Sequence, residues 1–193
     1  MSSEEQDTSF RWIPIPRIFQ PFLEDDPFER CIVCQRFLLE NRVTYMIEKV
    51  FKGTEVIVEY ALCLECCQSM RSDMSEESLM RIQAYMEERV DLLERHEHMI
   101  ASSPEGVDPW IAHCLLTDTP RQEADTYHIF GHCQGNRLLL SFYPFMVCNA
   151  AMKPLANLLS KKTRECLDDF TDQFLGMPPE FKKLFDDTPV CFI

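Results

Sequence analysis

Two Cys-x2-Cys pairs, Cys31-Ile-Val-Cys34 and Cys63-Leu-Glu-Cys66, are separated by 28 residues in this chain of 193 residues. A tight turn between two cysteines, here called a knuckle, lets both sulfurs point into one concavity. Two knuckles that meet place four thiolates around one point, and such a tetrahedron is a characteristic structural site for Zn²⁺. The spacing therefore predicts one structural Zn²⁺ ion bound by Cys31, Cys34, Cys63 and Cys66.

The segment between the two pairs has the pattern of a β-hairpin. Two runs in which apolar residues alternate with polar or flexible ones flank Lys52-Gly53-Thr54, a typical turn sequence. The alternating apolar positions are Val43, Tyr45 and Ile47 before the turn and Val56, Val58, Tyr60 and Leu62 after it. A hairpin of this length would bring the two knuckles together.

Residues 28–72 resemble the treble-clef and zinc-ribbon class of zinc fingers. The second pair comes just before Gln68-Ser69-Met70-Arg71, a polar segment that can form a first helical turn. A knuckle, a hairpin and then a pair at a helix start is the treble-clef order, so the resemblance implies that fold. The chain departs from the common pattern because Ile32-Val33 and Leu64-Glu65 occupy the turns in place of proline and glycine.

A zinc site whose four positions are all filled by protein leaves no place for a substrate, so this one is expected to stabilise the fold. Some treble-clef proteins are His-Asn-His nucleases, and RING-type ubiquitin ligases need a second zinc cluster. Residues 35–62 contain neither a histidine nor further cysteines, which argues against both activities. A thiol oxidoreductase is a further alternative, because Cys63 and Cys66 are expected at a helix start, but it gives Cys31 and Cys34 no role.

Charge and cysteine usage indicate the partners and the compartment. Lys and Arg number 19 against 32 Asp and Glu, a net charge of −13, which argues against a general binder of nucleic acid or anionic membranes. The acidic N-terminus lacks the pattern of a secretory signal, and no apolar run approaches the roughly 20 residues that span a bilayer. The chain is therefore expected to be cytoplasmic, where its ten cysteines stay reduced.

The sequence predicts an α+β fold. A long amphipathic helix is indicated by an apolar stripe at helical spacing, whose members are Leu79, Ile82, Met86, Val90 and Leu93. A second hairpin is expected around Gln134-Gly135-Asn136, and the residue patterns reveal no internal repeat. The expected parts are a Pro-rich extended arm (1–28), a four-cysteine zinc-binding module (29–72), the amphipathic connecting helix (73–100), a linker (101–109) and an α+β C-terminal domain (110–193).

Histidines in the expected C-terminal domain suggest a second, catalytic metal site. His128 and His132 lie four apart on an expected strand and so share a face, and Cys114 or His113 could be a third ligand. A metal-dependent hydrolase with its site at His128 and His132 is therefore one alternative function. A nucleic-acid-associated zinc-finger regulator is another.

The sequence favours a zinc-binding cytosolic protein of non-catalytic character that acts through contacts with protein partners. The Pro-rich arm and the amphipathic helix are its expected contact surfaces. Because structural zinc sites contribute folding free energy directly, Cys31→Ser or Cys63→Ser is expected to unfold residues 29–70 while the C-terminal domain stays intact.

Overall fold

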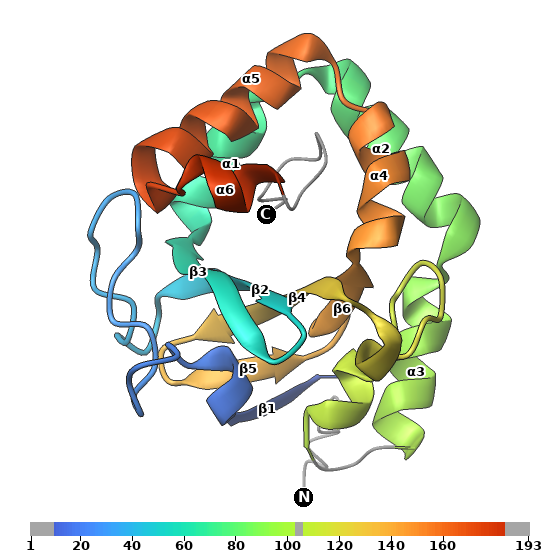
Figure 1. Cartoon of the computed structure of the whole chain (residues 1–193). Coiled ribbons are helices and arrows are strands. Elements are labelled where there is room, and N and C mark those ends of the chain that lie inside the picture. Colours follow the sequence, from blue (N-terminus) through green and yellow to red (C-terminus); the bar gives the residue numbers. More distant parts are fainter. Residues whose placement is uncertain (1–9, 103–105, 184–193) are drawn as a thin grey trace, which may run out of the picture.

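The computed structural model describes residues 10–102 and 106–183 and has an α+β fold built on one antiparallel sheet (Figure 1). The sheet has six strands in the order β1-β5-β4-β2-β3, with β6 paired to β4 beside β5. The strands are β1 (Arg11–Pro14), β2 (Thr44–Lys52), β3 (Glu55–Cys63), β4 (Thr126–Gln134), β5 (Arg137–Leu140) and β6 (Phe145–Cys148).

Helices form an arch over one face of this sheet, whereas the edge strand β1 lies at the end of the sheet farthest from the top of the arch in Figure 1. In that view α1 and α5 form one side of the arch and α2 and α4 the other. The helices are α1 (Leu64–Asp73), α2 (Glu76–Arg89), α3 (Leu92–Ser102), α4 (Asn149–Asn157), α5 (Lys161–Phe170), its continuation η4 (Thr171–Leu175), α6 (Pro179–Lys182), and the short turns η1 (Arg17–Phe19), η2 (Asp108–Ile111) and η3 (Arg121–Glu123).

Strand β2 is the centre of the fold. It pairs with β3 on one side and with β4 on the other, where the register runs from Thr44 opposite Gln134 to Lys52 opposite Thr126. Both faces of β2 are covered, so even the charged residues Glu48 and Lys49 are buried. The expected zinc-binding module and the expected C-terminal domain therefore share one sheet.

The expected long helix is wrong in one respect, because the structure has two helices there. Val90 is extended, with φ −136° and ψ 116°, and ends α2. The Asp91 carboxylate then accepts the backbone N–H of Glu94 at 2.9 Å, as a helix-capping residue does, and α3 begins. The apolar stripe continues across this break, so periodicity alone predicts one helix. No helix in the described ranges is long and apolar enough to span a membrane.

The N-terminal arm docks on its own chain. Strand β1 pairs with β5, and Phe19 is completely buried. The Glu59 carboxylate accepts the Phe22 N–H at 2.9 and 3.0 Å and pairs with the buried Lys49 ammonium at 2.9 Å. Residues 1–9 of the expected arm, 103–105 of the expected linker and 184–193 of the expected C-terminal domain lie outside the described residues.

Candidate metal centre

The first cysteine pair forms a tight knuckle. The Cys31 N–H donates to the Arg36 carbonyl at 2.9 Å, and the Gln35 N–H donates to the Cys31 carbonyl at 3.0 Å. Gln35 adopts φ +61°, a left-handed conformation that glycine takes more readily. Its side-chain amide also donates to the Ile32 carbonyl at 3.2 Å, which helps to hold the turn. The knuckle therefore forms without the expected glycine, and a glutamine takes that position.

The second pair lies where the hairpin meets the first long helix. Cys63 is the last residue of β3 and the N-cap of α1, with φ −64° and ψ 153°. Cys66 follows in the first turn of that helix. The chain therefore runs from the first knuckle through the β2–β3 hairpin to the start of α1.

The fold brings the four cysteine sulfurs together. All four Sγ atoms lie within 4.8 Å of one another, and Cys34 and Cys63 are 3.7 Å apart. A tetrahedral site with Zn–S bonds of ~2.3 Å has S···S edges of ~3.8 Å, so the cluster has the dimensions of a metal site. Cys31 and Cys63 are buried, Cys66 is half-buried and Cys34 is exposed. The group could hold a metal ion, and its members are the four cysteines that the spacing singled out.

Burial and backbone hydrogen bonds act in opposite directions on these thiols. Burial acts to raise the pKa of Cys31, but N–H groups of Cys34, Cys63 and Val33 point at its sulfur and lower the pKa overall. The Cys63 N–H lies 3.4 Å from that sulfur. In contrast, burial raises the pKa of Cys63 to about 11 and also raises that of Cys66. A cation at the centre is what would allow all four groups to be thiolates at neutral pH.

Two features lie next to the four-cysteine cluster: an ion pair and a fifth cysteine that points away from it. An ion pair between Arg36 and Glu65 joins the knuckle to the first turn of α1. Cys67 faces away from the cluster, with its Sγ 3.6 Å from the Leu62 carbonyl, and burial raises its pKa to about 12. Cys66, not Cys67, is therefore the fourth member of the cluster.

Within the described residues, the histidines do not form a second metal centre. His128 is fully buried, and its Nδ1 lies 2.8 Å from the Glu48 carboxylate, which also accepts the Tyr60 hydroxyl. His132 is half-buried with its ring against Tyr143, and His113 is exposed. Across residues 10–102 and 106–183 the four cysteines are the one group of three or more ligand side chains that could hold a metal. The three-ligand group that the hydrolase alternative needs is therefore not formed there. Sequence reasoning missed Glu48, which has no distinctive motif around it.

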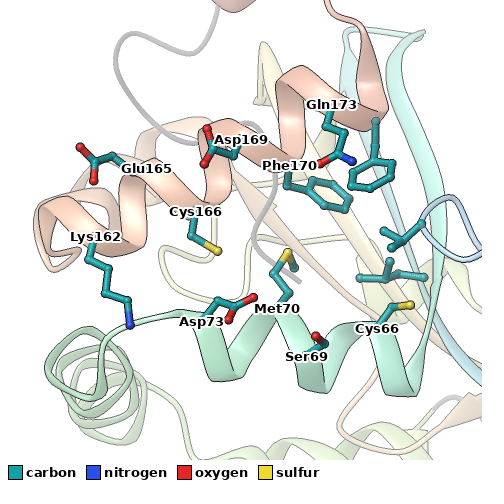
Figure 2. A pocket seen from close by; sticks show the side chains of 13 residues that line it. Cys66, Ser69, Met70, Asp73, Lys162, Glu165, Cys166, Asp169, Phe170 and Gln173 are labelled. Carbon is teal, nitrogen blue, oxygen red and sulfur yellow. The ribbon is translucent and has the colours of Figure 1, made fainter.

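A cavity of about 490 Å³ lies beside the metal centre, between α1 and the α5–η4 helix (Figure 2). Cys66, Met70 and Asp73 line its α1 side, and Cys166 and Phe170 line the opposite side. Burial raises the pKa of the Cys166 thiol, and the nearby carboxylates of Asp73 and Asp169 raise it further. Nucleophilic cysteines have a lowered pKa, and the surroundings of Cys166 act in the opposite direction.

Within the described residues the structure thus brings together one set of side chains that could hold a metal ion, at the junction of a knuckle, β3 and α1. Comparison with protein-family models, with curated protein sequences and with solved structures gives no match for this chain.

Proposed function

We propose that Cys31, Cys34, Cys63 and Cys66 hold one structural Zn²⁺ ion, and that the protein is a non-catalytic binding module whose fold depends on that ion. The observation that carries this proposal is the meeting of four Sγ atoms within 4.8 Å of one another. The order of knuckle, hairpin and helix supports a treble-clef-like unit around the ion. Four thiolates from the protein would leave no open coordination position for a substrate.

The ion would act as a cross-link between distant segments. It would tie the knuckle before β2 to the end of β3 and the start of α1, where a weak sulfur contact and an exposed ion pair also join them. Binding free energies for such sites are on the order of 10 kcal/mol, which equals much of the stability of a whole domain. Folding of the chain would therefore depend on the metal.

A groove of about 550 Å³ between α1, α2 and the sheet is the proposed binding surface. The stripe residues Leu79, Ile82 and Met86 of α2 line it, and they are only half-buried. Arg71 is the one charged residue in its lining, which also contains four methionines: Met46, Met74, Met86 and Met152. Methionine side chains are flexible and polarizable, so they suit a surface that receives apolar side chains of a partner. The partner would be a protein segment that presents such side chains.

The metal is tested on the full chain expressed without added zinc. Elemental analysis and native mass spectrometry should find one zinc per chain, and a strong chelator should abolish the dispersion of amide signals in the NMR spectrum. Cys166→Ser is the matched control, because it removes a thiol from outside the cluster and should keep the metal. A folded chain that binds no metal would overturn the proposal.

The groove is tested by site-specific photocrosslinking in cell extract. A photoreactive residue at Ile82, inside the groove, is compared with one at Met80 on the same helix, which is 70% exposed and outside the groove. We expect a discrete protein adduct from position 82 that is absent from position 80 and is lost in a Met86→Glu background. Equal adducts from both positions, or none from position 82, would contradict a binding role for the groove.

A further inference from the structure

Two stretches of this chain repeat the same local backbone. Cys114 begins a second knuckle, in which its N–H donates to the carbonyl five residues later at 2.8 Å, as the Cys31 N–H does at 2.9 Å. The carbonyl of each cysteine accepts the N–H four residues later, from Asp118 at 2.9 Å and from Gln35 at 3.0 Å. Gln35 and Asp118 are also the two non-glycine residues of the described chain with positive φ, at +61° and +56°.

The strands that follow each knuckle correspond as well. The β2–β3 hairpin turns at Gly53 with φ +59°, and the β4–β5 hairpin turns at Gly135 with φ +55°. Strand β3 ends at Cys63, which is the N-cap of α1, and β6 ends at Cys148, which is the N-cap of α4. Strands β5 and β6 together correspond to β3, with residues 141–144 inserted between them.

The next helices meet through reciprocal hydrogen bonds. Ser75 caps α2 and Ser160 caps α5, and their hydroxyl oxygens lie 2.8 Å apart. The Ser75 N–H donates to the Thr163 hydroxyl at 3.0 Å, and the Ser160 N–H donates to the Ser78 hydroxyl at 2.8 Å. The hydrogen bond from the cap of α2 to α5 therefore has a counterpart from the cap of α5 to α2. Two segments related by a twofold rotation axis make such reciprocal contacts. Figure 1 shows the same relation in the arch, where α1 and α2 are matched by α4 and α5.

The central strands fit that axis. Both begin with the same residue pair, Thr44-Tyr45 in β2 and Thr126-Tyr127 in β4. They are antiparallel neighbours, and Glu48 lies opposite Phe130 at the middle of the ladder. Counted from the shared Thr-Tyr pair, Glu48 and Phe130 are also equivalent positions, so the axis passes between them.

We infer that residues 30–89 and 113–170 are two copies of one structural unit, and that the second copy contains an incomplete version of the metal centre. Cys114, Thr117, Cys148 and Ala151 occupy the positions of Cys31, Cys34, Cys63 and Cys66. Two of the four thiols are therefore kept, and the other two are replaced by a hydroxyl and a methyl group.

Distances in the second copy match those in the first. The Cys148 N–H lies 3.3 Å from the Cys114 Sγ, where the corresponding distance between Cys63 and Cys31 is 3.4 Å. The Thr117 Oγ1 lies 3.5 Å from the Cys148 Sγ, against 3.7 Å between the sulfurs of Cys34 and Cys63. The second centre thus lacks two ligand atoms but keeps the backbone that would position them.

The inference predicts that two substitutions complete a second metal site. Thr117→Cys combined with Ala151→Cys would place four thiols around one point in the second copy. The matched control is Thr117→Cys with Ala150→Cys, which adds the same number of thiols but puts one on an exposed position beside the buried Ala151. The reverse change, Cys34→Thr with Cys66→Ala, should remove the metal from the first copy.

The test counts metal ions per chain by native mass spectrometry after Zn²⁺ loading and follows thiolate-to-cobalt absorption during Co²⁺ titration. We expect one ion in the unchanged chain and in the control, and two in Thr117→Cys/Ala151→Cys. The inference rests on the metal function proposed for the first copy. It is tested by the number of metal ions that the variant binds beyond the number bound by the unchanged chain. The ion count of the unchanged chain tests that function separately.

A folded Thr117→Cys/Ala151→Cys chain with no more metal than the control would overturn the inference. Because Ala151 is buried, that variant could fail to fold. Thr117→Cys alone changes an exposed position and creates a three-thiol site. It should take up a second equivalent of Co²⁺ with a weaker affinity, and a titration that saturates at the endpoint of the unchanged chain would equally overturn the inference.

Discussion

The two knuckles of this protein have the same backbone but different surroundings. Cys31 and Cys63 at the first are 0 and 1% exposed, and their counterparts Cys114 and Cys148 at the second are 3 and 4% exposed. Cys34 and Thr117 are both exposed. The surroundings differ at the fourth position, where Cys66 is half-buried and Ala151 is 2% exposed. The comparison indicates that the second turn keeps its backbone with two of the four thiols replaced and with Ala151 packed in the core, whereas the first keeps all four thiols for the proposed ion.

The largest expected effect is the difference in stability between Cys63→Ser and its counterpart Cys148→Ser. Cys63→Ser should lose the zinc, and because the ion is worth on the order of 10 kcal/mol the chain should not fold. Cys148→Ser should fold and lose only about 1–3 kcal/mol, as expected for a buried polar replacement. Urea unfolding followed by circular dichroism, together with zinc content, measures both.

Equal destabilisation by the two variants would contradict the expectation that only the first site depends on a metal ion.

Loss of the metal should also show how far unfolding spreads through the sheet. The sequence predicted that loss of metal would unfold residues 29–70 alone, but β2 shares a nine-residue ladder with β4. We therefore expect amide protection to be lost in β4 as well as in the zinc-binding hairpin, which hydrogen exchange would show.

The sequence predicted the cluster of four cysteines better than it predicted the architecture. The four cysteines and both hairpins follow from local patterns, and the structure contains each of them. The second copy was missed because Thr117 and Ala151 remove the cysteine motif and residues 141–144 split the strand that matches β3. The paired Thr-Tyr and hairpin glycines were signals that could have revealed it. The place where the arm docks could not be predicted, because it depends on a surface that exists only after β4 and β5 pair.

The next largest loss of stability is expected on the sheet face that the arm covers, where the two copies have different residues at equivalent positions. Lys49 in β2 corresponds to Gly131 in β4, and Phe19 packs directly over that glycine. A Cβ on Gly131 would lie 2.8 Å from the Phe19 ring, so Gly131→Ala should push the arm away and cost about 1–3 kcal/mol. Chemical denaturation measures the loss. Phe19→Leu in the Gly131→Ala background should recover part of it, and no recovery would mean that the contact is not what destabilises the variant.

The reciprocal bonds between α2 and α5 give a smaller and symmetrical effect. Ser78→Ala and Thr163→Ala each leave one helix-capping N–H without its acceptor, so each should cost about 1–2 kcal/mol. Because the two hydroxyls belong to one network, the double variant should cost less than the sum of the single ones. Thr163→Ser keeps the hydroxyl and serves as the control. A several-fold difference between the single variants would contradict the twofold relation at this contact.

The smallest effect compares the two hairpin glycines, which have the same backbone conformation. At φ +59° and +55° an alanine is strained in either turn, by about 1 kcal/mol. Gly53 has open space where a Cβ would be, so Gly53→Ala should cost that strain and little more. A Cβ on Gly135 would lie 3.3 Å from the Glu40 carbonyl oxygen, a backbone atom, so Gly135→Ala should cost more than Gly53→Ala. Thermal unfolding of the two variants measures this difference. If the two losses were equal, the loop before β2 would have to move freely, and the contact between the copies at this corner would not be a fixed part of the fold.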